Sequence, residues 1–341
     1  MATATDTSTN VRSLLRNQYV KYGLIAVILA AMPTVFGGFL ANEIIVFSVF
    51  VLGFDLMLGY TGELSFGHAV YLGFGAYGTV LSLEYLVSNF YLAAAISLLI
   101  ATVGGVVFGY LSLRRRGIYF SMITLALAQM VYYVIFRWTG FTGGSNGMAL
   151  PDTSAAIGPF SPLTGSMEFY VFGLVVLTAT WLGVRRVVRS PFGRTLIAIR
   201  ENEDRMVHLG YETNSFLWIA FTMSAFVCGI AGVLYSALFG FIAPETIYWT
   251  ASGDVVIMAL LGGIGTLGGP IVGAAAFVFL SDVFTLLTDD WRILFGVIII
   301  FIVLFAPEGI WGMYQDFVEE RRSSFGAKSV LDKLGLGSDE K

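Results

Sequence analysis

Two glycine-rich stretches carry the residues of this sequence that are best suited to contact a small polar solute. The first is LGYTGELSFGH, from Leu58 to His68, and the second is LGGIGTLGGPI, from Leu261 to Ile271. Superposed, they share a leucine, two glycines and a second leucine at the same positions, which indicates an internal repeat. Glycines leave backbone N–H and C=O groups accessible beside hydroxyl side chains. These groups suit hydrogen bonding to a solute rather than covalent chemistry.

Ionisable side chains near these stretches have two interpretations each. Asp55 and Glu63 are carboxyl groups at or near long apolar segments, where a charge is costly and marks a pathway, an ion pair or a water-filled cavity. Glu63 fits a pathway or a hydrated interface equally well, whereas Asp55 better fits an interface or a pair between helices. The two histidines, His68 and His208, lack the partner spacing of a metal site or of a nucleophile's base, so we predict no enzyme activity.

The composition sets the environment of these residues. Of the 341 residues, 57% are hydrophobic and only 12% are charged. Continuous apolar runs such as 171–182 exclude the alternating pattern of a β-barrel. We predict an all-α, polytopic transmembrane helical bundle with about 8–10 spans, interrupted by glycine-rich segments in both halves. The predicted spans are 22–40, 44–58, 68–88, 91–113, 118–136, 168–184, 216–242, 254–262, 270–287 and 291–306.

In lipid, a glycine-rich interruption must be buried in protein or must line a water-filled path, because its backbone groups have no other partners. Paired interruptions in the two halves of a transporter point to the substrate route. The alternative is that these glycines only allow turns or close helix packing. Recurrence in both halves favours the path, and the predicted path residues are Tyr60, Thr61, Glu63, Ser65, Gly262, Gly263, Thr266 and Gly269.

Basic residues predict the orientation. They cluster before the first span, at Arg114–Arg116, and in a polar and charged segment at 185–215 that we call the arginine island. The positive-inside rule places all three clusters in the cytoplasm. The predicted organisation is a cytoplasmic segment 1–21, a membrane domain 22–306 that includes the arginine island, and a cytoplasmic tail 307–341, with both termini cytoplasmic. The single cysteine, Cys228, is predicted to be a small buried residue.

The arginine island contains a predicted short helix. Pro191 and Gly193 break the chain, the segment from Arg194 to Leu209 has neither glycine nor proline, and Gly210 is a C-terminal stop. Its apolar stripe is Leu196, Ile199, Met206 and Leu209. The stripe could lie against the protein's own membrane domain, against lipid headgroups or in a groove of another protein.

Five segments of the sequence together resemble the permease subunit of branched-chain amino-acid ABC importers. They are GYTGELSFGHAVYLGFGAYG (59–78), RRRGIYFSMITLALAQMV (114–131), TGGSNG (142–147), GRTLIAIRENEDRMVHLGY (193–211) and LLGGIGTLGGPIVGA (260–274). Their order and spacing are those of the family, and the resemblance covers about residues 43 to 312.

The resemblance implies a subunit of the prokaryotic inner membrane that works with a homologous second permease, two cytoplasmic ATPase subunits and an extracytoplasmic substrate-binding protein. It implies that a coupling helix maps onto 194–210, and the residues assigned to it are Gly193, Arg194, Arg200, Glu201, Asn202, Glu203 and Gly210. At Asp204, Arg205 and Met206 this sequence departs from the small or apolar residues common in the family.

The resemblance also bears on cofactors and substrate. The chain lacks the phosphate-binding pattern G-x-x-x-x-G-K-[ST], so we predict that it binds no cofactor and that ATP is used by partner subunits. Backbone amides and carbonyls suit a zwitterionic amino acid, but urea or a short amide would fit equally well, and related permeases carry urea. A different class remains open, an ion-coupled secondary transporter in which Asp55 and Glu63 bind the ion. Composition gives no support for nucleic-acid binding.

Overall fold

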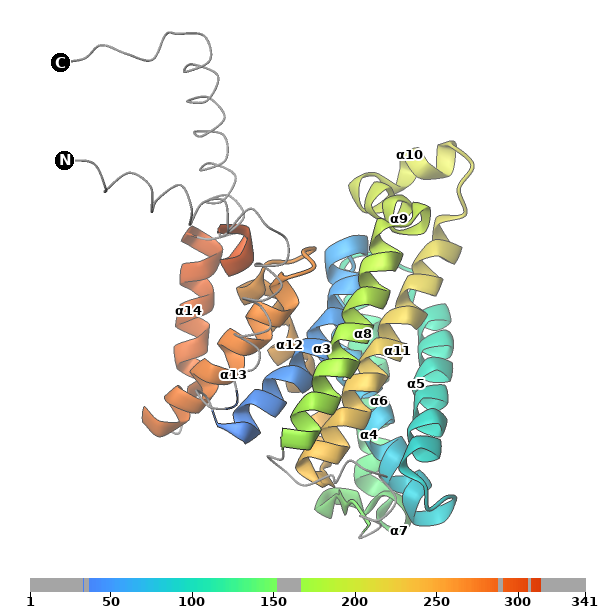
Figure 1. The fold of residues 1–341 in the computed structure, drawn as a ribbon. Helices are drawn as coiled ribbons and strands as arrows, with labels where there is room; N and C mark the ends of the chain where they lie inside the picture. The colour runs from blue at the N-terminus through green and yellow to red at the C-terminus, as the bar shows by residue number, and fades with distance from the viewer. Residues whose placement is uncertain (1–32, 34–36, 152–166, 288–290, 306–307, 314–341) are drawn as a thin grey trace, which may run out of the picture.

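The computed structural model describes residues 33, 37–151, 167–287, 291–305 and 308–313. Within them the chain is almost entirely helical (Figure 1). The long helices are α3 (Gly38–Thr61), α4 (His68–Tyr85), α5 (Phe90–Ser112), α6 (Ile118–Arg137), α8 (Met167–Arg189), α11 (Thr213–Phe239), α12 (Trp249–Gly262), α13 (Gly269–Leu287) and α14 (Trp291–Phe305). The shorter elements are α7 (Thr139–Thr142), η1 (Gly144–Asn146), β1 (Met148–Ala149), α9 (Pro191–Glu201), α10 (Glu203–His208), β2 (Phe241–Ile242) and η3 (Pro244–Ile247).

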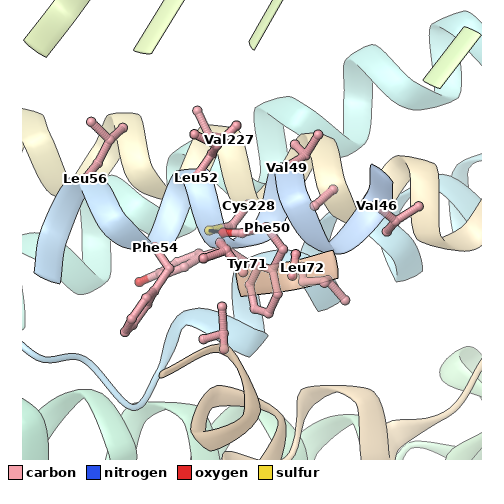
Figure 2. Packing of buried hydrophobic residues seen from close by; sticks show 14 of the residues in the cluster. Val46, Val49, Phe50, Leu52, Phe54, Leu56, Tyr71, Leu72, Val227 and Cys228 are labelled. Carbon is pink, nitrogen blue, oxygen red and sulfur yellow. Dashed lines mark hydrogen bonds between the residues drawn. The ribbon is translucent and has the colours of Figure 1, made fainter. Parts of the chain in front are cut away.

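Helix α3 is the centre of the bundle. Helices α8, α11, α12 and α13 all pack against it, so nearly every residue of α3 from Ala41 onward is buried. Figure 2 shows its apolar side chains on several sides of the helix, with Tyr71 and Leu72 of α4 and Val227 and Cys228 of α11 beside them. A helix that is apolar all round is expected in the interior of a membrane bundle. Cys228 is fully buried, as predicted.

A hydrogen-bonded chain joins α4, α11 and α3. His68 Nε2 lies 2.8 Å from Ser224 Oγ, and Ser224 Oγ donates to the Gly53 carbonyl at 2.5 Å. A hydroxyl group has one hydrogen, so the histidine must be the donor to the serine. His68 therefore has a structural role, in a hydrogen bond across helices.

The helices coincide with the predicted spans. Nine of the ten predicted segments match the long helices named above, and the first, 22–40, lies mostly outside the described residues. Among the helices that the structure describes, six can cross a membrane by length and apolar composition alone: α3, α5, α6, α8, α11 and α13. The shorter α12 and the segment Ile293–Ile302 of α14 are also apolar. The chain is thus an all-α, multi-pass membrane protein.

The two ends of the bundle differ. At one end lie α9, α10 and the loop with Arg114–Arg116, and we call it the arginine-rich end (Figure 1). At the opposite end α7, η1 and β1 form a cap, in which β1 pairs antiparallel with β2 through Met148 and Ile242. The TGGSNG segment, 142–147, forms part of this cap.

Candidate functional site

The two glycine stretches meet at the arginine-rich end. Asp55 Oδ1, near the end of α3, accepts a hydrogen bond of 2.9 Å from the Gly265 amide in the second stretch. A Cβ atom added to Gly59 would lie only 2.6 Å from the Gly265 nitrogen. The glycines therefore let two backbones touch. Asp55 is 2% exposed and fills the role of a pairing group between elements, one of the two roles that the sequence favoured for it.

The arginine island differs from its prediction in two ways. Its first residues, Arg185 to Arg189, continue α8 beyond the predicted end at 184. The single helix predicted from Arg194 to Leu209 is also wrong, because Asn202 adopts an extended conformation with φ −161° and separates α9 from α10. The Asn202 side chain accepts a hydrogen bond from the Arg205 amide and so begins α10.

The predictions for Pro191, Gly193 and Gly210 differ less from the structure. Pro191 and Gly193 lie inside the first turns of α9 rather than before it, because proline fits the first helical position. Gly193 packs tightly against the preceding turn, because a Cβ atom added to it would lie 2.6 Å from the Val187 carbonyl oxygen. Gly210 is a stop as predicted, with φ +87°.

The apolar stripe of α9 and α10 packs on the protein itself. Leu196, Ile199 and Met206 are buried, with exposed fractions of 1%, 4% and 8%. Leu209 is instead exposed at 66%. Of the three partners considered for the stripe, the structure therefore shows the protein's own membrane domain. The opposite face of the two helices remains exposed. Its residues include Arg194, Ile197, Glu201, Asp204, Arg205, Val207 and His208.

Arg200 connects α9 to the first glycine stretch. Its Nη1 atom donates to the carbonyl oxygen of Gly59. Its side chain also covers Gly62, where an added Cβ would lie 3.0 Å from Arg200 Cγ. Arg200 Nη1 would lie 3.5 Å from a Cβ atom added to Gly265. A single side chain from the arginine island thus touches both glycine stretches.

Arg116 forms the second connection, and it involves α10. Its guanidinium donates to both carboxylate oxygens of Glu203, at 3.0 to 3.2 Å, and to Asn214 Oδ1 at the start of α11. Nη1 also donates to the Leu113 carbonyl at 2.7 Å. Burial raises the pKa of Glu203, but the bonds from Arg116 and Thr213 outweigh it, so the net pKa is lowered. The carboxyl is held in its ionised form.

Glu63 of the first stretch joins the same arginine more loosely. Its Oε1 lies 3.9 Å from Arg116 Nε, and its Oε2 accepts a hydrogen bond of 3.1 Å from the Gly117 amide. The pKa of Glu63 is raised, chiefly by burial, despite these neighbours. Glu63 therefore lies at the arginine-rich end, close to the interface position that the sequence left open.

The other predicted path residues form internal contacts. Thr61 Oγ1 donates to the Met57 carbonyl at 2.7 Å, and Ser65 Oγ accepts from the Gly67 amide at 3.2 Å. Tyr60 is 5% exposed. These bonds fix the turn between α3 and α4, and their assignment to a solute path stays a prediction.

In the second stretch, Thr266 Oγ1 donates to the Gly263 carbonyl and accepts from the Gly269 amide, both at 2.9 Å. Gly262 and Gly269 pack backbone to backbone, with a Cβ on Gly262 only 2.5 Å from the Gly269 carbonyl carbon. Trp181 of α8 also donates to the Leu267 carbonyl at 2.8 Å. The second stretch is therefore a close-packed joint.

Several residues of this site were not singled out by their chemistry in the sequence. Arg116 was used only for orientation, while Thr213, Asn214 and Trp181 were not named. Arg116 lies 87 residues from Glu203 along the chain, so no spacing links them. The only available signal was the expectation that all the basic clusters share one side of the membrane, and the Arg116–Glu203 contact places two of these clusters at the same end of the bundle.

Comparison with known proteins gives a consistent result. Residues 22–303 match the family described as "Branched-chain amino acid transport system / permease component". The high-affinity branched-chain amino acid transport system permease protein LivM of Escherichia coli K12 is 25% identical, over 80% of this chain and 69% of its own length.

More distant relatives match shorter parts. The probable branched-chain amino acid transport permease protein LivM of Methanocaldococcus jannaschii is 25% identical over 64% of this chain and 67% of its own length. The autoinducer 2 import system permease protein LsrC of Yersinia pestis is 26% identical over 49% of both chains. No solved structure matches the chain significantly.

Proposed function

This chain belongs to the family of permease components of branched-chain amino acid transport systems, and from that premise we propose that it carries branched-chain or similar amino acids across the prokaryotic inner membrane. In this proposal it forms part of the path of an ATP-driven importer together with a homologous second permease. Two cytoplasmic ATPase subunits bind and hydrolyse ATP, and an extracytoplasmic binding protein delivers the substrate. The arginine-rich end faces the cytoplasm.

One observation carries the proposed coupling mechanism: α9 and α10 contact the first glycine stretch through half-buried polar bonds, and α3 carries the connection on to the second stretch. Arg200 of α9 donates to Gly59, Arg116 lies between Glu203 of α10 and Glu63 of the first stretch, and Asp55 of α3 accepts from Gly265 of the second stretch. The outer face of α9 and α10 is left exposed for an ATPase subunit. A displacement of these two helices would therefore move the ends of α3 and α12 together.

The alternatives within and outside this class differ in how the two carboxyl groups are used. In an ion-coupled transporter Asp55 and Glu63 would bind the ion. Here Asp55 accepts a hydrogen bond from the Gly265 amide, and Glu63 accepts one from the Gly117 amide. These bonds favour a structural role. A urea or short-amide importer would use the same coupling route, and only the transported substrate would differ.

The coupling proposal is tested by reversing the charge of Glu201, which is exposed at the end of α9. In the reconstituted complex we expect Glu201→Arg to insert and assemble normally but to reduce amino-acid uptake by about tenfold while ATP hydrolysis continues. Arg200→Met should uncouple the complex in the same way by removing the bond to Gly59. Both rates are measured in proteoliposomes with radiolabelled leucine.

The matched control is Glu84→Arg, the same charge reversal at an exposed position of α4 far from α9 in sequence. It should leave both rates unchanged. Unchanged uptake in Glu201→Arg would remove this residue from the ATPase interface. Uptake that persists without ATPase subunits, driven by an ion gradient, would overturn the importer proposal itself.

A further inference from the structure

A carboxylate and several aromatic rings lie together near the end of the bundle opposite the arginine island. Glu245 is in the short helix η3, which contacts α4, α6 and α12. The Tyr248 amide bonds to the Glu245 carbonyl at 3.1 Å, so the two residues are one 3₁₀ turn apart. Side chains three residues apart in a 3₁₀ helix lie on the same side. Glu245 and Tyr248 therefore project in one direction.

Helix α6 supplies the other wall. The rings of Tyr132 and Tyr248 have their centroids 4.9 Å apart, and Phe136 stacks on Tyr132 at 5.6 Å. Trp249 continues the aromatic surface, with its ring centroid 6.0 Å from that of Tyr248. We call Glu245, Tyr132 and Tyr248 the outer aromatic site.

The carboxylate of this site has no ion-pair partner among the described residues. Glu245 is exposed and forms no salt bridge with any residue that the structure describes. Tyr132 and Tyr248 are half-buried, so their rings are partly accessible. A carboxylate without a cation, beside accessible tyrosine rings, can accept a positively charged ligand.

The ligand class follows from this chemistry. Aromatic faces attract cations through their quadrupole, and a carboxylate adds charge and hydrogen-bond acceptors. A primary ammonium has several N–H donors and a compact charge, so it can contact the carboxylate, a ring face and a hydroxyl together. Urea and sugar-like solutes carry no charge and would gain little from such a site.

The position of the site relates it to transport. Tyr248 directly precedes α12, and α12 ends at Gly262, the second residue of the second glycine stretch. The site and that stretch are thus the two ends of one helix. Resting on the function proposed above, we propose that the outer aromatic site binds the ammonium group of an incoming amino acid before it enters the path.

The test uses the purified full-length complex without binding protein and three probes: leucine, 3-methylbutylamine, which lacks the carboxylate, and 4-methylpentanoate, which lacks the ammonium. Binding is followed by the fluorescence of Trp249, next to Tyr248, and Trp249→Phe identifies the signal. Leucine and the amine should give a saturable change, and 4-methylpentanoate none. Glu245→Gln and Tyr132→Leu should each weaken amine binding about fivefold to tenfold. The control variants Glu84→Gln and Tyr119→Leu, exposed positions on α4 and α6, should bind normally.

Saturable binding of 4-methylpentanoate, or unchanged amine binding in Glu245→Gln, would overturn the proposal. A second measurement separates this site from the function on which it rests. ATP-dependent leucine uptake together with no amine binding removes the site and leaves the importer function intact. Amine binding by a complete complex that does not take up amino acids refutes the transport function instead.

Discussion

The two glycine stretches occupy equivalent places in the fold but are built differently. Each joins two helices at the arginine-rich end, α3 to α4 and α12 to α13. The first is held by side chains, with Glu63, Ser65 and Thr61 all in hydrogen bonds and two arginines against it. The second also has side-chain bonds, from Thr266, Trp181 and Asp55, and adds close backbone contacts of Gly262, Gly269 and Gly273. Under the coupling mechanism proposed above, the first stretch receives movement from α9 and α10, and the second is a close-packed joint that follows.

The largest effect is expected at the second stretch. In Gly262→Val the new side chain meets the Gly269 backbone, with its Cβ 2.5 Å from the carbonyl carbon and 3.0 Å from the Gly273 nitrogen. Backbone cannot move aside as a flexible side chain can, so we expect a loss of about 3 kcal/mol or more of stability. The measurement is thermal unfolding of the detergent-solubilised complex.

The control is Gly253→Val on the same helix, where an added Cβ meets no atom within 4 Å. It should unfold like the unmodified protein. Gly62→Ala tests the other side of the comparison, because its Cβ would meet only the flexible Arg200 side chain at 3.0 Å. With φ +78° at this position, the expected loss is about 1–2 kcal/mol. Equal losses for Gly62→Ala and Gly262→Val would remove the distinction between the two stretches.

The next effect concerns the charged bonds of the first stretch. Arg116→Met removes the bonds to Glu203, Asn214 and Leu113 together. Because Arg116 and Glu203 are partly exposed, the cost in stability should be modest. We expect uptake to fall about tenfold at normal assembly, measured together with ATP hydrolysis. Arg115→Met, an exposed neighbour in the same loop, should behave like the unmodified protein; a similar fall in this variant would mean that only the loop's positive charge matters.

The sequence was sufficient for those features that depend on local chemistry. Apolar runs located α5, α6 and α11 to within a few residues, and the glycines located both joints. The start of α3 was missed, because the helix begins at Gly38 and runs through the predicted break between 40 and 44. The grouping of Arg114–Arg116 with the arginine island also followed, because positive charge segregates to one side of a membrane. These properties need no knowledge of which residues touch.

Features that depend on which residues contact one another could not be predicted from the sequence. Six arginines lie in the arginine island, and nothing in their spacing distinguishes Arg200 as the one that reaches Gly59. The break at Asn202 was missed because helix ends were sought at glycine and proline, whereas asparagine can end one helix and cap the next. Helix α8 continues through Arg189 because charged residues stop a membrane span without stopping a helix.

A pH series examines the two carboxyl groups that face Arg116. The pKa of Glu63 is raised and that of Glu203 is lowered from the usual 4.5. A raised carboxyl pKa means that the folded state binds the proton more tightly, so protonation of Glu63 adds stability as the pH falls. For Glu203 the stability is present above pH 4.5 and is lost as the pH falls through its lowered pKa.

We therefore expect Glu63→Gln, which resembles the protonated form, to change the unfolding temperature little at pH 7 and to flatten its rise as the pH is lowered toward 4.5. Glu203→Gln should lower the unfolding temperature at pH 7, by the loss of one charged pair. The same measurement on Glu168→Gln, an exposed carboxyl in the first turn of α8, gives the background. If the two variants exchange behaviour, Glu63 and not Glu203 is the principal partner of Arg116.

The smallest effect is expected where the two stretches meet. Asp55→Asn keeps an oxygen acceptor for the Gly265 amide and removes only the charge, so a structural pairing group should tolerate it with less than about a twofold change in uptake. Asp55→Leu removes the acceptor, leaves the Gly265 amide unpaired in the interior, and should reduce assembly. An ion-binding carboxylate would respond differently, since Asp55→Asn would then abolish uptake as fully as Asp55→Leu. ATP-driven uptake by these two variants thus distinguishes a bond that transmits movement between the stretches from a site that binds an ion.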